Sequence, residues 1–247
     1  MRKITFVFIS LLIITSTISC TSTKTIQKNM NLNSYSLAYI MDSDPIENKS
    51  HYSLYIDTIN FDNNQINDTT KVIREKGWFV PLVFINMWDS QNKCIAGKTL
   101  MQEEMTTFLR ESLSDEIDRS GAFMLDSKCD SAYKIEISID EIKTEGPYHS
   151  SGFFYFAIYA AGYSYSDNAG PAISNLTISY KLKKNNKIVH SNKFSSERMT
   201  EPIATRYNNT KLLQKDYAIS MVEATSYNFK NIIEKIVLDI NSYFDRT

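Results

Sequence analysis

The amino-acid sequence predicts an α+β fold, in which an antiparallel or mixed sheet carries two amphipathic helices packed on one face. Three patterns support this fold class. Residues 132–142 alternate strictly between apolar and polar side chains, residues 176–194 have the pattern of a hairpin, and segments 99–121 and 220–244 repeat apolar residues every three or four positions. The length left for the domain, residues 49–247, suits one buried core.

Two strands are expected before the first helix. Residues 51–60, HYSLYIDTIN, predict the first strand, and residues 77–88, GWFVPLVFINMW, predict a longer second strand. Pro81 indicates that this second strand lies at a sheet edge or contains a bulge, because proline has no N–H to donate to a strand ladder.

The clearest helix is predicted over residues 99–121. Thr99 and Gln102 have the spacing of a capping box, and Gly121 stands where a C-terminal cap is expected. The periodic apolar residues are Met101, Met105, Phe108, Leu109, Leu113 and Ile117. Their spacing predicts a helix with one buried face.

The next segment, AYKIEISIDEI at 132–142, predicts a strand with one face in the core and one face in water. The residues expected in the core are Tyr133, Ile135, Ile137 and Ile139. The residues expected in water are Lys134, Glu136, Ser138 and Asp140.

The segment 150–166, SSGFFYFAIYAAGYSYS, contains no charged residue and is apolar on both alternations. Three interpretations are open: a central strand covered on both faces, an exposed surface that docks a partner protein or rests against lipid, and a short buried helix. Two helices on one face of the sheet would leave the other face open. The residues of an exposed surface would be Phe154, Phe156 and Ile158 on one alternation, and Phe153, Tyr155 and Tyr159 on the other.

A hairpin and a terminal helix are expected to complete the domain. KNNK predicts a tight turn between residues 176–183 and the strand KIVHSNKF. The last helical pattern predicts a short helix from residue 210, then a main helix over 220–244 that begins at a capping box of Ser220 and Glu223. Its inward residues are expected to be Ala224, Ile232, Ile236 and Ile240.

The N-terminus has the pattern of a signal peptide over residues 1–19. Arg2 and Lys3 precede an apolar run that is too short to cross a bilayer as a helix. Cys20 follows Thr-Ile-Ser, which resembles the lipobox of bacterial lipoproteins, whose cysteine carries lipid and becomes the mature N-terminus. The stretch after Cys20, TSTKTIQKNMNLNS, is polar and lacks periodicity, so residues 20–48 are predicted to be the lipidated cysteine and a flexible tether. A cleaved secreted protein and an uncleaved anchor are the alternatives.

The lipoprotein resemblance also implies a location. The residue after Cys20 is not Asp, which in some lineages retains a lipoprotein in the inner membrane, and no acidic patch follows it. The resemblance therefore implies an outer-membrane lipoprotein, held by three acyl chains including palmitate and facing the periplasm. Removing Arg2 and Lys3 with the signal leaves 25 basic and 28 acidic residues, a net charge of −3 that argues against nucleic acid as a partner.

No motif for catalysis, a cofactor or a metal stands out. His51, His149 and His190 lie far apart, and none has a second His or a Cys at the spacing of metal ligands. The sequence therefore predicts a protein that is not an enzyme and needs no cofactor. Cys94 and Cys129 lie in polar, loop-like stretches; a disulfide between them and two unpaired thiols are both open.

Four segments in order carry a resemblance to a known class. They are LSDEIDRSGAF, SAYKIEISIDEI, LTISYKLKKNNKIVHSNKF and the helix DYAISMVEATSYNFKNIIEKIVLDI, within residues 78–244. This succession resembles the auxiliary lipoproteins of bacterial ABC-type envelope transport systems and of outer-membrane assembly, which share a fold with the N-terminal domain of TolB. The resemblance implies a non-catalytic adaptor or accessory factor with an envelope protein partner. The alternative is a periplasmic or surface ligand-binding lipoprotein that uses the aromatic residues of 150–166.

Overall fold

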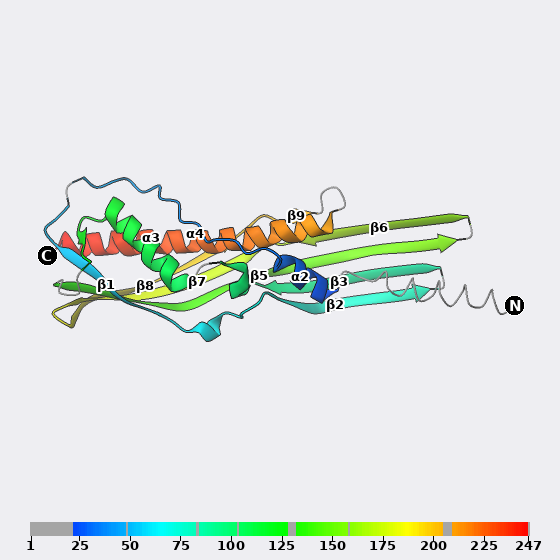
Figure 1. Ribbon diagram of the computed structural model, residues 1–247, viewed down its shortest axis with the longest axis horizontal. Coiled ribbons are helices and arrows are strands. Elements are labelled where there is room, and N and C mark those ends of the chain that lie inside the picture. Colours follow the sequence, from blue (N-terminus) through cyan, green and yellow to red (C-terminus); the bar gives the residue numbers. More distant parts are fainter. Residues whose placement is uncertain are drawn as a thin grey trace.

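The computed structural model describes residues 22–47, 49–82, 84–102, 104–127, 132–157, 159–204 and 209–246. Within these residues the chain forms one nine-stranded sheet and three α-helices, so the α+β fold class is confirmed. The molecule is elongated, with the helices gathered along part of the length of the sheet (Figure 1).

Strand β5 (Tyr133–Ala157) is 25 residues long and organises the whole sheet. Its first half pairs in parallel with β1 (Ser53–Phe61) and antiparallel with β7 (Ile173–Lys184). Its second half pairs antiparallel with β3 (Ile85–Ile95) and β6 (Ala160–Ala169). β5 therefore runs through two halves of the sheet. In the core half it pairs with β1 and β7, and in the outer half it pairs with β3 and β6.

The remaining strands extend these two halves. In the core half, β4 (Met124–Leu125) pairs in parallel with β1, and β8 (Lys187–Met199) pairs with β7. In the outer half, β2 (Lys71–Leu82) pairs with β3, and β9 (Ile203–Ala204) pairs with the end of β6. Only the pairings of β1 with β4 and β5 are parallel, so the sheet is mostly antiparallel.

Several strand predictions are confirmed. The strand expected at 51–60 is β1, and the alternation of 132–142 is the start of β5. All four residues expected in the core there, Tyr133, Ile135, Ile137 and Ile139, are buried. The KNNK turn joins β7 to β8, and its two asparagines have φ values of 51° and 62°, the left-handed conformation that a two-residue hairpin turn requires.

The prediction of one long strand over 77–88 is wrong. The chain reverses between Leu82 and Ile85, which face each other across the β2–β3 hairpin. The sequence at this point contains none of the Gly, Asn or Asp residues that mark tight turns, so the apolar run gives no sign of the reversal. Pro81 lies on β2, and the prediction of an edge strand is confirmed because β2 pairs with β3 alone.

Helix α3 (Met105–Ser120) starts later than the sequence predicts. Thr99 lies in a separate 3₁₀ turn, Lys98–Leu100, and the helix begins after Glu104, so the predicted capping box is wrong. At the other end the prediction is confirmed, since the N–H of Gly121 donates to the carbonyl of Ile117 at the C-cap.

Helix α4 (Thr210–Phe244) is continuous over 35 residues rather than split into two helices. Its N-cap is Asn209, whose side chain accepts a hydrogen bond from the N–H of Leu212, and Ser220 is buried inside the helix, so the second capping box is wrong as well. The inward-facing residues are as predicted: Ala224, Ile232, Ile236 and Ile240 are buried. α4 packs along β7 and β8 and against α3.

A third helix, α2 (Thr23–Met30), occupies part of the predicted tether. Ile26 and Met30 are buried against the domain, and Leu37 beyond them is also buried, so residues 23–37 are packed rather than flexible. The side-chain amide of Asn29 donates to Gln214 of α4 at 2.7 Å. The apolar residues of α2 are few, and their partners lie far away in sequence, so local composition does not reveal this packing.

Candidate docking surfaces

The outer half of the sheet ends in a surface that we call the apolar arm. It consists of residues 77–82 and 84–88 of the β2–β3 hairpin, and residues 150–157 and 159–166 of the β5–β6 hairpin. The four strands extend beyond the helices in the order β2-β3-β5-β6 (Figure 1). None of these residues is charged.

The arm exposes apolar side chains on both faces. The alternation along β5 places Phe153 and Tyr155 on the face opposite the buried core residues, which we call the outer face, and Phe154 and Phe156 on the helix side. The large side chains of the outer face are Trp78, Val80, Leu82, Ile85, Met87, Phe153 and Tyr155, and their exposed fractions lie between 37% and 55%. On the helix side Phe79, Phe156 and Tyr163 are exposed.

For the described residues, this arrangement excludes two of the three interpretations of 150–166, and the docking surface stays a prediction. The described residues form two strands, so a buried helix is excluded for them, and their exposure contradicts a central strand covered on both faces. Tyr159 is 98% exposed at the turn between β5 and β6, whereas Ile158 lies outside the described residues. Local patterns predict only half of this surface, because the contribution of the β2–β3 hairpin depends on a pairing between distant segments.

Two glycines let aromatic rings lie flat across the strands of the arm. A Cβ atom on Gly152 would lie 2.4 Å from the Trp88 ring, and one on Gly162 would lie 2.4 Å from the Tyr155 ring. Trp88 and Gly152 are paired neighbours, as are Tyr155 and Gly162. Each ring therefore shields the backbone of the neighbouring strand, which stabilises a part of the sheet that extends beyond the described helices (Figure 1).

A chain of hydrogen bonds fixes the base of the arm to the helices. The amide of Gln214 on α4 donates to the hydroxyl of Tyr148 at 3.0 Å, and this hydroxyl donates to Asp167 of β6 at 3.1 Å. Asn29 of α2 continues the chain through its bond to Gln214. Burial raises the pKa of Tyr148 well above its usual value, so the phenol stays protonated and can donate. α2, α4, β5 and β6 are thereby held in one arrangement.

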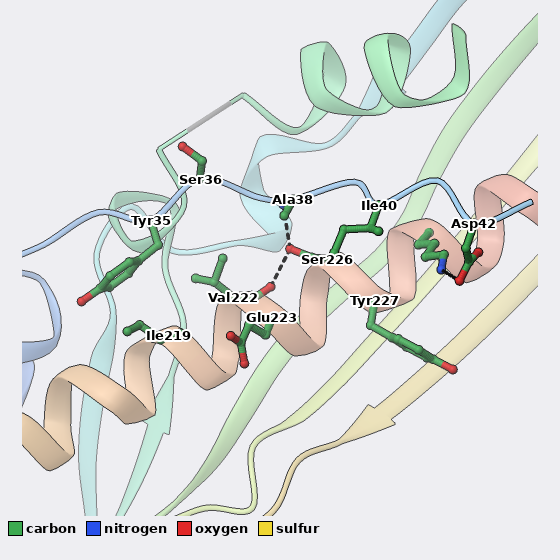
Figure 2. Close-up of a pocket in the computed structure, with 11 residues that line it drawn as sticks. Tyr35, Ser36, Ala38, Ile40, Asp42, Ile219, Val222, Glu223, Ser226 and Tyr227 are labelled. Atoms are coloured by element: carbon green, nitrogen blue, oxygen red, sulfur yellow. Dashed lines mark hydrogen bonds and ion pairs between the residues drawn. The ribbon is translucent and has the colours of Figure 1, made fainter. Parts of the chain in front are cut away.

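A second surface is a groove between α4 and residues 35–42, which we call the strap. The groove has a volume of ≈670 Å³ (Figure 2). Its apolar lining includes Ile40, Ile219, Val222 and Tyr227. The backbone N–H of Ala38 donates to the hydroxyl of Ser226 on α4 at 3.1 Å, which holds the strap against the helix.

Charged groups flank one end of the groove. Lys230 forms an ion pair with Asp42 at 2.5 Å, and this bond raises the pKa of the lysine and lowers that of the carboxyl group. Burial raises the pKa of the neighbouring Glu234. Behind the strap, the phenol of Tyr39 donates to Glu116 at 2.6 Å, and burial raises the pKa of this tyrosine well above its usual value. The groove therefore combines an apolar floor with both signs of charge at its rim.

The remaining predicted site residues do not join these surfaces. Cys20 and Cys129 lie outside the described residues. Cys94 lies in β3 rather than in a loop; it is a buried free thiol, and burial raises its pKa to about 12. A disulfide with Cys129 stays a prediction. In the part of the chain that is described, no three His, Cys, Asp or Glu side chains are placed to hold a metal ion, and no helix is both long and apolar enough to span a bilayer.

Two solved structures illustrate what this chain is similar to. One is a protein of the DUF330 family from Xanthomonas campestris, with 12% identity, a TM-score of 0.49, and coverage of 87% of this chain and 100% of that one. The other is a minor lipoprotein from Acinetobacter baumannii, with 12% identity, a TM-score of 0.30, and coverage of 57% and 88%. No family model matches the chain, and no curated protein matches it. Neither name refers to TolB.

Proposed function

We propose that this chain is a lipid-anchored envelope lipoprotein that acts as a non-catalytic adaptor in envelope assembly or transport. In this proposal Cys20 holds the protein at the outer membrane, on the periplasmic side, and a segment of an envelope protein partner binds in the groove. The observation that carries the proposal is the presence, among the described residues, of two separate exposed apolar surfaces, the arm and the groove. Exposed apolar patches on water-facing domains mark interaction sites, and an adaptor needs two of them.

The groove suits an extended or helical protein segment. Its floor is apolar, while Lys230, Asp42 and Glu223 provide charges that can fix the register of a bound chain. The hydroxyl of Ser226 accepts a hydrogen bond from the backbone N–H of Ala38 in the strap. One extended segment of the chain is therefore already bound to α4 in this way.

A photo-reactive amino acid at position 227 tests the adaptor function. Tyr227 lines the groove and is half exposed, so the probe faces a bound partner. We expect one discrete protein adduct in cells that produce the anchored chain, and loss of the adduct on Cys20→Ala, because the anchor brings the two proteins together. The same probe at Leu238, an exposed residue of α4 outside the groove, is the control. Equal adducts at the two positions, or none at 227, would contradict the proposal.

The groove also favours a second candidate function, a lipoprotein that binds a small apolar ligand. A volume of ≈670 Å³ lies within the range of ligand sites. The sequence places a ligand site at the aromatic residues of 150–166, but these residues do not line the groove. In this second proposal the ligand binds in the groove instead.

Ile219→Trp separates the two candidates. Ile219 is half-buried in the groove, and an indole there fills the space that a small ligand needs. Native mass spectrometry of the purified chain measures retained ligand directly. A ligand-binding protein shows a bound small molecule in the wild type and loses it in the variant, with an unchanged melting temperature. An adaptor shows no such mass, and its protein adduct at position 227 weakens in the variant.

A further inference from the structure

We propose that the apolar arm inserts into the interface of the phospholipid membrane to which Cys20 is attached, with anionic headgroups at its base. This inference rests on the lipid anchor of the proposed function and assigns a partner to the arm. It has four supports: the composition of the arm, its exposure on both faces, the position of α2, and the charges at its base.

The composition of the arm matches the boundary between lipid and water. The chain has two tryptophans, Trp78 and Trp88, and both lie in the arm. Four tyrosines accompany them, at 155, 159, 163 and 165, and the described residues of the arm contain no charge. Trp and Tyr gather at membrane interfaces because their rings prefer the apolar side while their N–H and O–H groups reach water or headgroups.

Exposure on both faces favours lipid over a folded partner. A protein that docks on a sheet covers one face, and the opposite face of this arm would still present Trp78, Val80 and Leu82, or Phe79 and Phe156, to water. Lipid surrounds an inserted element on all sides. The six residues from Gly77 to Leu82 extend roughly 20 Å, at about 3.3 Å per strand residue, which is enough to pass the headgroups of one leaflet.

The N-terminal end of α2, which is close in sequence to Cys20, points toward the arm (Figure 1). Asn31, at the C-terminal end of α2, bonds the backbone of Thr70, immediately before β2 begins. α2 packs along β2, and its other end points toward the arm (Figure 1). Eight helical residues extend about 12 Å, so Ser22 lies well along β2. Cys20 is two residues before Ser22 in the chain, a separation of at most about 7 Å, so the acyl chains attach close in sequence to the end of α2 that points toward the arm.

The charges at the base of the arm complement anionic headgroups. Residues 71–76 of β2, KVIREK, carry three basic side chains and one acidic side chain, and all four are exposed. Lys24 and Lys28 on α2 are exposed beside them and add two positive charges. A cluster of basic residues close to a lipid anchor binds anionic lipids through its charge.

The open edges of the sheet limit the depth of insertion. Among the described residues, β2 has no neighbour beyond β3, and on the side of β6 away from β5 only the short β9 pairs with it, at its base. Unpaired backbone groups are costly in hydrocarbon but are satisfied by water and headgroups. Pro81 removes one N–H from β2. The arm therefore lies in the interface of one leaflet and does not cross the membrane.

Tryptophan fluorescence tests this inference directly, because both tryptophans report on the arm. The chain from residue 20 onward, carrying Cys20→Ala and therefore no lipid, is mixed with vesicles of phosphatidylcholine and phosphatidylglycerol. We expect emission to shift to shorter wavelength, and brominated lipids to quench it. Vesicles of phosphatidylcholine alone should bind more weakly, and added salt should reduce the difference, because the basic residues contribute through charge.

The double variant Leu82→Asp with Phe153→Asp should bind vesicles at least about tenfold more weakly, because charged side chains on a lipid-facing strand are unfavourable. Both residues are exposed, so its melting temperature should match the parent. Leu238→Asp, equally exposed but on α4, is the matched control and should bind as the parent does.

Three results would overturn the membrane assignment. The first is an emission spectrum that vesicles leave unchanged. The second is vesicle binding that the double variant and its control weaken equally. The third is a blue shift that appears without lipid as protein concentration rises, which would identify a second copy of the chain as the partner of the arm. In each case a protein adduct at position 227 would leave the adaptor function standing, so the two proposals can fail separately.

Discussion

Cys20→Ala is expected to release the protein from the membrane fraction while leaving its fold unchanged. A single acyl chain holds a protein to a bilayer only marginally, at ~0.8 kcal/mol per buried CH₂, whereas two or more chains make attachment effectively permanent. The lipobox resemblance implies three chains, all on Cys20, and the expected result rests on that implication. Cys20 precedes the first described helix, which begins at Thr23, so none of the described core packing depends on it.

Fractionation with a carbonate wash measures the effect. Wild-type protein should stay in the membrane pellet, and the Cys20→Ala protein should move to the wash, because contact of the arm with the interface is reversible. Cys94→Ala is the matched control, since Cys94 is a buried thiol inside the domain and carries no anchor. Retention of the Cys20→Ala protein in the pellet at the wild-type level would show that the chain is not held by a lipidated cysteine.

Ile137→Ala is expected to lower the free energy of unfolding by ~2 to 5 kcal/mol, the usual cost of truncating a buried large side chain. Ile137 is 1% exposed in the first half of β5, between β1 and β7. The cavity left by the missing atoms cannot collapse easily, because β5 is held on both sides by neighbouring strands.

Ser138→Ala is the matched control for this substitution. Ser138 is the next residue, half-buried on the other face of the same strand, and no described core residue depends on its side chain. We expect its effect to stay within about 0.5 kcal/mol. Thermal and denaturant melts of both variants compare the two faces of β5. Equal losses of stability at positions 137 and 138 would mean that the alternation does not separate core from water.

Where a short-range pattern repeats, the sequence predicted the structure well. The alternation of 132–142, the Asn-Asn turn between β7 and β8, and the inward residues of α4 all follow from the fixed periods of strands and helices. These features depend on neighbours two to four residues away. They can therefore be read without knowing what packs against them.

The ends of the helices were predicted less well. The pairs Thr99 and Gln102, and Ser220 and Glu223, have capping-box spacing, yet neither starts a helix. A short polar pattern occurs often by chance, and the packing of α4 along β7 and β8 keeps the helix continuous through Ser220. Tertiary burial therefore overrode the local capping signal.

The candidate surfaces also combine features that follow from local sequence with features that depend on tertiary contacts. The sequence determined that residues 150–166 are uncharged and apolar on both alternations, and that a cysteine follows a signal-like run, because composition and order are local properties. Only the tertiary structure decided that this segment pairs with the β2–β3 hairpin to form one arm, that α2 packs where a tether was expected, and that the strap and α4 enclose a groove. Each of these depends on contacts between segments distant in the chain, whose free energy comes from burial and pairing that no local pattern encodes.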